Sequence, residues 1–204
     1  MKKYVFVILT LFAFSSLLAQ SNESRIFGYI GVSSTNFPGY YSDNWSNGTS
    51  LGLGLDLSIN ERVSFMSYAV YSYFSINENH VRKNLVVNSG NVRIVGGTLR
   101  KFNISGNIKY KILTSKMITP YLIAGLGYFV IGTSDAPRAI NDVGISIRSF
   151  EVTTEYAFSS NFGAGFDVDF NSKFGVFLDI RYLIGFTENQ ITSIPFRMGI
   201  TYNL

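Results

Sequence analysis

The sequence predicts an all-β chain that forms an eight-stranded antiparallel up-and-down transmembrane β-barrel, preceded by a cleaved signal peptide. Three observations predict this fold class. Charged residues make up only 15% of the chain, apolar residues alternate with small or polar ones in several separate segments, and short links alternate with long ones. A typical soluble protein contains roughly 25% charged residues. The low charge content therefore suits a chain whose outer surface faces lipid rather than water.

The N-terminal segment has the pattern of an export signal. Lys2 and Lys3 form a short basic region, residues 4–14 are an almost unbroken apolar run, and Ala19 is a small residue suited to signal peptidase. The apolar run is too short for a stable membrane anchor, although a retained N-terminal helix is an alternative. We expect residues 1–19 to be the signal peptide and residues 20–204 to be the barrel domain. Position 20 is Gln, so the cysteine of a lipoprotein signal is absent.

Eight segments of the remaining chain are predicted to be strands. Five of them alternate clearly between apolar residues and small, polar or charged ones, namely residues 51–59, 102–112, 156–170, 174–186 and 196–204. Three more are rich in β-forming residues, namely 25–34, 62–74 and 121–131. In the first two of these three, either face could be the apolar one. After the export signal, no segment approaches the roughly twenty apolar residues of a membrane helix.

The links between these segments alternate in length. Residues 60–61, 113–118 and 171–173 form short links, whereas residues 35–48, 75–97, 132–152 and 187–193 form longer ones. In an up-and-down meander this pattern places all short links at one end, as in transmembrane barrels with tight periplasmic turns and long external loops. Because an open sheet edge cannot lie in hydrocarbon, the strands are expected to close into a barrel. A soluble exported lipid-binding barrel is disfavoured, since its outer face would need many charged residues.

With these strands in place, the chain resembles the small eight-stranded outer-membrane β-barrels of double-membraned bacteria, the OmpA-like and OmpX-like group. The resemblance covers residues 25–204 and is strongest at residues 119–128, 161–182 and 195–204. It implies an outer-membrane location and a porin-like architecture. The implied partners are outer-membrane lipid and lipopolysaccharide, the barrel-insertion machinery and an unknown surface protein, with no nucleic acid. Such barrels usually end on an aromatic residue, whereas this chain ends on Leu204.

Nine charged residues alternate with the apolar, lipid-facing positions and are therefore expected in the lumen. They are Asp56, Lys101, Lys109, Lys111, Asp167, Asp169, Asp179, Arg181 and Arg197. Ionisable groups at membrane depth are costly unless they are paired, so these residues are predicted to form a network. Asp167 and Asp179 are expected to be diagonal neighbours linked by Arg181, whose guanidinium can bridge two carboxylates. A packed structural plug and a gated or selective narrow channel are the two interpretations of this network.

Aromatic residues toward the strand ends are expected to form the interface girdles of a membrane barrel. The periplasmic girdle is predicted to contain Tyr110, Phe170, Phe174 and Tyr202, and the outer girdle Tyr73, Tyr128, Tyr156 and Phe186. In the first long link, Tyr40, Tyr41 and Trp45 are candidates for contact with lipopolysaccharide or another molecule, or for packing within their own loop.

The sequence predicts no enzyme, and no catalytic, cofactor-binding or metal site. Barrel enzymes that act on lipids generally need a histidine beside a serine or an acid. The single histidine, His80, lies in the link 75–97 with no serine within two residues, and no metal-ligand spacing is present. The leading hypothesis is a structural or surface-interaction barrel whose external loops bind surface components. The alternatives are a narrow pore or transport or secretion accessory and, third, a lipid-modifying enzyme dependent on His80.

Overall fold

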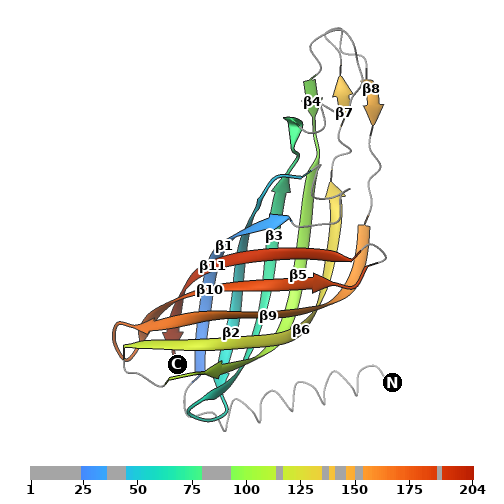
Figure 1. Ribbon diagram of the computed structural model, residues 1–204. Helices are drawn as coiled ribbons and strands as arrows, with labels where there is room; N and C mark the ends of the chain where they lie inside the picture. The colour runs from blue at the N-terminus through green and yellow to red at the C-terminus, as the bar shows by residue number, and fades with distance from the viewer. Residues whose placement is uncertain are drawn as a thin grey trace, which may run out of the picture.

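The computed structural model describes residues 24–35, 45–79, 93–113, 117–134, 138–140, 146–149, 154–187 and 190–204. Eight antiparallel strands form a closed barrel, and each segment predicted to be a strand corresponds to one of them (Figure 1). The barrel strands are β1 (Ser24–Thr35), β2 (Gly48–Ser58), β3 (Val63–Ser75), β5 (Thr98–Lys111), β6 (Ile118–Ser134), β9 (Thr154–Asp169), β10 (Phe174–Gly185) and β11 (Ile191–Asn203). The predicted all-β, eight-stranded antiparallel barrel is therefore confirmed.

The barrel strands pair with their neighbours in chain order, and the ring closes between the first and the last. β1 and β11 are in register from Arg25 opposite Asn203 to Thr35 opposite Ser193. The order around the ring is β1-β11-β10-β9-β6-β5-β3-β2. This is the up-and-down meander that the alternating links predict. Within the described residues, no helix has the length and apolar character needed to cross a membrane.

The strand ends joined by short links lie together at one end of the barrel, beside the C-terminus, and the strand ends joined by long links lie at the other end (Figure 1). Two of the short turns are fixed by asparagine side chains. The backbone amides of Arg62 and Val63 donate to Asn60 Oδ1 at 2.9 and 2.8 Å, and Asn171 holds the β9–β10 turn in the same way. An asparagine that accepts from the backbone two and three residues ahead replaces hydrogen bonds that a tight turn leaves unmade.

A small second sheet extends beyond the long-link end of the barrel (Figure 1). It consists of β4 (Arg93–Val95), β7 (Arg138–Ile140) and β8 (Ser146–Ser149), in the order β4-β7-β8. These residues fall in the predicted links, so this sheet is a difference from the prediction. Gly96 and Gly97 separate β4 from β5 with φ of 79° and 89°, a conformation that glycine adopts without steric cost.

The two faces of the barrel differ in the way that a lipid-facing barrel requires. The outward positions carry large apolar side chains that are open to the surroundings, including Leu126 and Phe158, each 71% exposed. The inward positions are buried. In β1 the inward residues are Arg25, Phe27 and Tyr29, which settles the face that the sequence left open in this strand. In β3 the inward residues run from Ser64 to Phe74 at every second position.

Buried apolar side chains inside the barrel form two clusters. The loop-end cluster contains Trp45, Phe74, Leu99, Phe129, Ile131, Ala157 and Ile191. The central cluster contains Phe27, Tyr29, Met66, Tyr68, Val70, Tyr121, Ile123 and Phe177. An eight-stranded barrel has an interior just wide enough for side chains to fill it. These clusters, together with the polar groups between them, occupy that interior.

Inward glycines make room for the largest side chains. Gly52 is the cross-strand partner of Tyr29, and Gly163 is the partner of Arg181. A methyl group on Gly163 would lie only 2.8 Å from Arg181 Cγ, and one on Gly52 would overlap the Tyr29 ring. The glycine on one strand therefore allows the large residue on the next strand to turn across the lumen.

Candidate functional site

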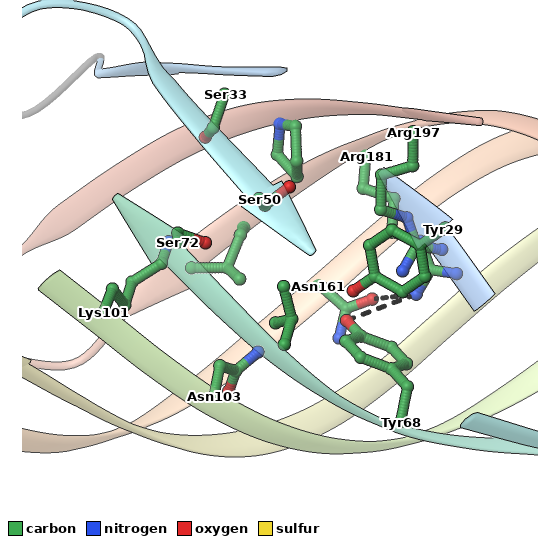
Figure 2. Close-up of a pocket in the computed structure, with 13 residues that line it drawn as sticks. Tyr29, Ser33, Ser50, Tyr68, Ser72, Lys101, Asn103, Asn161, Arg181 and Arg197 are labelled. Atoms are coloured by element: carbon green, nitrogen blue, oxygen red, sulfur yellow. Dashed lines mark hydrogen bonds between the residues drawn. The ribbon is translucent and has the colours of Figure 1, made fainter. Parts of the chain in front are cut away.

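The period-two alternation of the strands places the charged residues on the inner wall of the barrel. Seven of the nine residues expected there are buried, namely Asp56, Lys101, Lys109, Asp167, Asp179, Arg181 and Arg197. Asp169 and Lys111 are partly exposed and lie near the ends of β9 and β5. Figure 2 shows Arg181 and Arg197 side by side on one part of the inner wall and Lys101 on another.

Lys109 is the centre of a charged cluster near the short-turn end. Its ammonium donates to Asp56 at 3.0 Å and to Asp167 at 2.6 Å, and it lies 4.3 Å from the centre of the Tyr121 ring. Asp56 is on β2 and Asp167 is on β9, four places apart in the ring of eight strands. Lys109 thus joins two opposite walls of the barrel.

Arg25 extends this cluster toward the barrel rim. Its guanidinium donates to both carboxylate oxygens of Asp169, at 3.3 and 3.2 Å, and lies 4.0 Å from Asp167. Sequence reasoning missed Arg25 because the inward face of the first strand was ambiguous. The charge itself was the available signal, since an arginine on the other face would lie against lipid.

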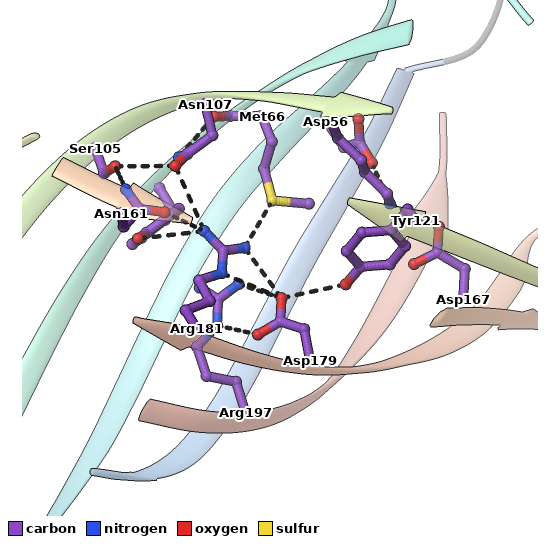
Figure 3. A network of polar contacts seen from close by, with 12 residues as sticks. Asp56, Met66, Ser105, Asn107, Tyr121, Asn161, Asp167, Asp179, Arg181 and Arg197 are labelled. Atoms are coloured by element: carbon purple, nitrogen blue, oxygen red, sulfur yellow. Dashed lines mark hydrogen bonds and ion pairs between the residues drawn. The ribbon is translucent and has the colours of Figure 1, made fainter. Parts of the chain in front are cut away.

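Asp179 is the centre of a second charged cluster, which crosses the middle of the barrel (Figure 3). Arg197 donates to it through Nε at 2.7 Å and through Nη2, and Arg181 donates through Nη2 at 3.0 Å. The Tyr121 hydroxyl donates to the same carboxylate at 3.1 Å. One buried carboxylate therefore pairs with two guanidinium groups.

The expectation that Arg181 links Asp167 to Asp179 is wrong. The two aspartates do lie at diagonal positions on β9 and β10, because Asp179 is opposite Gly165, two residues from Asp167. However, Arg181 pairs with Asp179 alone, and Asp167 pairs with Lys109 and Arg25. Lys109 on β5 approaches Asp167 from across the bore, which a comparison of adjacent strands could not reveal.

Neutral polar side chains complete the contacts of Arg181. Its Nη1 donates to Asn161 Oδ1 at 3.3 Å and to the Tyr68 hydroxyl at 3.4 Å. Asn161 donates in turn to Ser105 Oγ at 3.1 Å, and Asn107 donates to the Met66 carbonyl at 3.2 Å. Sequence alternation places these residues on the inner wall, but it does not pair them with Arg181.

The aromatic residues predicted for the two interface girdles are all exposed on the outer wall of the barrel. Phe174 and Tyr202 are cross-strand partners near the short-turn end, with ring centres 5.1 Å apart. Tyr73 and Phe186 lie near the long-link end of their strands, and Tyr156 near that of β9. A role in contacting the membrane interface stays a prediction for this set.

Trp45 is not an exposed contact residue. Only 6% of its surface is accessible, and its ring packs in the loop-end cluster while its backbone forms a bridge with Ile76. The apolar cluster excludes the indole from the surface, so this candidate is corrected to a core residue. Tyr40, Tyr41, His80 and residues 1–19 lie outside the described residues.

The described part of the chain contains no group of three or more His, Cys, Asp or Glu side chains that could hold a metal ion. The carboxylates of the interior are instead engaged by lysine and arginine, as the contacts above establish. This arrangement of fixed, paired charges suits mechanical bracing of the barrel.

Comparison with known proteins identifies a family and several similar folds. The family described as outer membrane protein beta-barrel domain matches residues 6–203. No curated protein matches the sequence.

Three of the similar solved structures are bacterial surface barrels. Neisserial surface protein A has 11% identity and a TM-score of 0.58, with 89% of this chain and 97% of that chain covered. A major outer membrane protein from Thermus thermophilus has 9% identity and a TM-score of 0.57, with 89% and 99% covered. Ail, the attachment invasion locus protein of Yersinia pestis, has 14% identity and a TM-score of 0.54, with 91% and 100% covered. At these identities the likeness concerns the fold.

Proposed function

The chain belongs to the outer membrane protein β-barrel domain family, and from this premise we propose that it serves as a structural or surface-interaction protein whose barrel interior is closed. The resemblance to the small outer-membrane barrels is confirmed by the family match and by the closed eight-stranded ring. In this role, side chains seal and brace the lumen of the barrel, and the external links form the binding surface.

One observation carries the proposal of a closed lumen. Arg181 on β10 contacts Tyr68 on β3, and these two strands are four places apart in the ring of eight. The contact therefore spans the full bore. Lys109 spans it again nearer the short turns, and the loop-end cluster fills it nearer the long links. Three layers of buried side chains lie across the path that an ion or solute would follow.

Conductance in planar bilayers tests the closed lumen. The purified protein is expected to be silent in molar salt, and a variant with Arg181→Ala and Arg197→Ala should stay silent as well, because the Lys109 layer and the loop-end cluster still cross the bore. Heat-modifiable migration on gels checks that both proteins form a folded barrel. Steady conductance by the unaltered protein would overturn the closed lumen and favour the narrow pore or transport accessory.

The external links are proposed as the binding surface because three short strands within them, β4, β7 and β8, pair into a sheet beyond the barrel. Lipopolysaccharide is the first candidate partner, since it surrounds the outer end of a barrel in the outer membrane. A variant in which residues 76–97 and 135–153 are replaced by short turns is expected to bind purified lipopolysaccharide more weakly than the intact barrel. Equal binding by a correctly folded variant would contradict this role of the links.

We also propose that residues 1–19 are removed on export and that the protein is not an enzyme. Mass spectrometry of the protein from the outer-membrane fraction should give an N-terminus at Gln20, and an intact Met1 would contradict cleavage. A His80→Ala variant should leave the lipid A and phospholipid profiles of the cell unchanged. A changed profile would support the lipid-modifying alternative.

A further inference from the structure

A small cavity lies inside the barrel, on the long-link side of the arginines (Figure 2). Its volume is about 30 Å³, and its wall includes Ser33, Ser50, Ser72, Lys101, Asn103 and Arg197. A single water needs on the order of 10–15 Å³ of such space, so there is room for about two waters or one ion of similar total size. The cavity is too small for an organic ligand.

Hydrogen-bonding groups in the wall of this cavity lack partners. The hydroxyls of Ser33 and Ser50 and the side-chain amide of Asn103 are buried and make no hydrogen bond with the described protein atoms. All three side chains belong to residues at least nine-tenths buried. Buried polar groups in folded proteins are nearly always satisfied, because an unmade hydrogen bond carries the full cost of desolvation. The two hydroxyls and the Asn103 Nδ2 group are therefore available to donate to an acceptor in the cavity.

Lys101 adds a buried positive charge to the same wall. The residue is only 4% exposed, and its ammonium lies 3.4 Å from Ser193 Oγ and 5.9 Å from the centre of the Phe74 ring. Among the residues that the structure describes, no carboxylate oxygen lies within 4.0 Å of this ammonium. A buried charge without a partner is strongly unfavourable.

The four aspartates of the two charged clusters are already engaged elsewhere. Asp56 and Asp167 contact Lys109, Asp169 contacts Arg25, and Asp179 contacts both central arginines. Three cations, Lys101, Arg181 and Arg197, line the cavity, and Asp179 contacts only the two arginines.

We propose that this cavity binds one small monovalent anion, of the size and charge of chloride. Such an ion accepts hydrogen bonds from Ser33, Ser50 and Asn103, and it also balances the charge of Lys101. Waters would satisfy the same donors but would leave the ammonium uncompensated. This inference goes beyond the proposed function, because a closed structural barrel does not in itself require a bound ion.

The loop-end cluster shields the proposed site from the external solution. Phe74, Leu99 and Ile191 each lie one inward position nearer the long links than Ser72, Lys101 and Ser193. The anion would therefore be enclosed as the barrel folds. For this reason the test must refold the protein in each salt rather than exchange salts around the folded barrel.

The test compares thermal unfolding of the mature barrel refolded in sodium chloride with that of the barrel refolded in sodium gluconate at equal ionic strength. Gluconate cannot enter the cavity, so chloride is expected to raise the unfolding temperature in a saturable manner. Crystals grown with sodium bromide should show an anomalous peak within hydrogen-bond distance of Lys101 Nζ. Equal stability in the two salts, or a cavity without anomalous density, would overturn the proposal and assign the space to water.

Two variants separate the site from general salt effects. Lys101→Met removes the charge and should abolish the chloride dependence, whereas Lys111→Met, which changes a lysine at the rim, should preserve it. If Lys101→Met does not fold, Ser50→Ala serves instead. Losing one donor to an ion should raise the chloride concentration for half-maximal stabilisation by about tenfold. Unaltered chloride dependence in the cavity variants would overturn the assignment of the site.

Discussion

Replacing Asp179 with Asn removes the charge that Arg181 and Arg197 both contact at the centre of the barrel. The amide has nearly the shape of the carboxylate, so packing is preserved while the charge is lost. One of its two terminal atoms becomes a donor, which conflicts with the donors of both guanidinium groups and of the Tyr121 hydroxyl. The substitution therefore tests charge pairing rather than shape.

The expected cost follows from burial. The Asp179 side chain is 0% exposed, and the two arginine side chains are almost as deeply buried. Breaking a buried ion pair by removing one partner costs about 3–5 kcal/mol, because the other charge is left uncompensated. The matched control is Asp169→Asn, since that side chain is 26% exposed and pairs with Arg25 near the rim. Water can solvate the rim pair, so its loss should cost about 1 kcal/mol.

Equilibrium unfolding in urea, with the barrel folded into lipid vesicles, measures both variants against the unaltered protein. The single tryptophan, Trp45, reports unfolding by fluorescence, and the gel shift on heating confirms the folded state. Asp179→Asn should lower the free energy of unfolding by at least about 2 kcal/mol more than Asp169→Asn. If the two variants are equally stable, the central ion pairs do not brace the barrel as the geometry implies.

Three further outcomes are expected. Lys109→Met leaves two buried carboxylates on opposite walls without their shared cation, so the free energy of unfolding in urea should fall by about 3–5 kcal/mol; a change below about 1 kcal/mol would contradict the pairing. Gly163→Ala places a methyl group against the Ile180 carbonyl oxygen and 2.8 Å from Arg181 Cγ, and this overpacking should cost about 1–3 kcal/mol in the same assay. Trp45 fluorescence should resist acrylamide quenching in the folded barrel and become quenchable in urea, whereas strong quenching of the folded protein would place the indole at the surface.

The sequence was sufficient to predict the barrel strands, because a strand with one lipid-facing wall must alternate with a period of two. The sequence was insufficient to predict which face of β1 points into the barrel. In the structure, Ile26 and Ile30 point outward, while Phe27 and Tyr29 point inward. Both faces of that strand are apolar, so hydropathy cannot distinguish them. The outer sheet was not predicted either, since its strands of three or four residues are too short for alternation to be read.

The pairing of the interior charges could not be predicted from the sequence for a different reason. Alternation alone predicts that Asp56, Lys109 and Asp167 face inward, but their partnership depends on where strands on separate walls meet across the bore. That position is set by the stagger of the whole ring. A search along neighbouring strands favours Arg181 as the partner of Asp167, whereas the closed barrel brings Lys109 to it. Predicting which charged residues pair across the bore therefore requires the three-dimensional structure of the complete ring.

The contacts across the bore also bear on the lifetime of the folded protein. Lys109 joins β2 to β9, and Arg181 joins β10 to β3, so neither set of contacts exists until the ring of strands is nearly complete. Interactions that form after the folding transition state slow unfolding without accelerating folding. The contacts of Lys109 and the contact of Arg181 with Tyr68 therefore form late in folding. They should make the inserted barrel long-lived even if its equilibrium stability is modest.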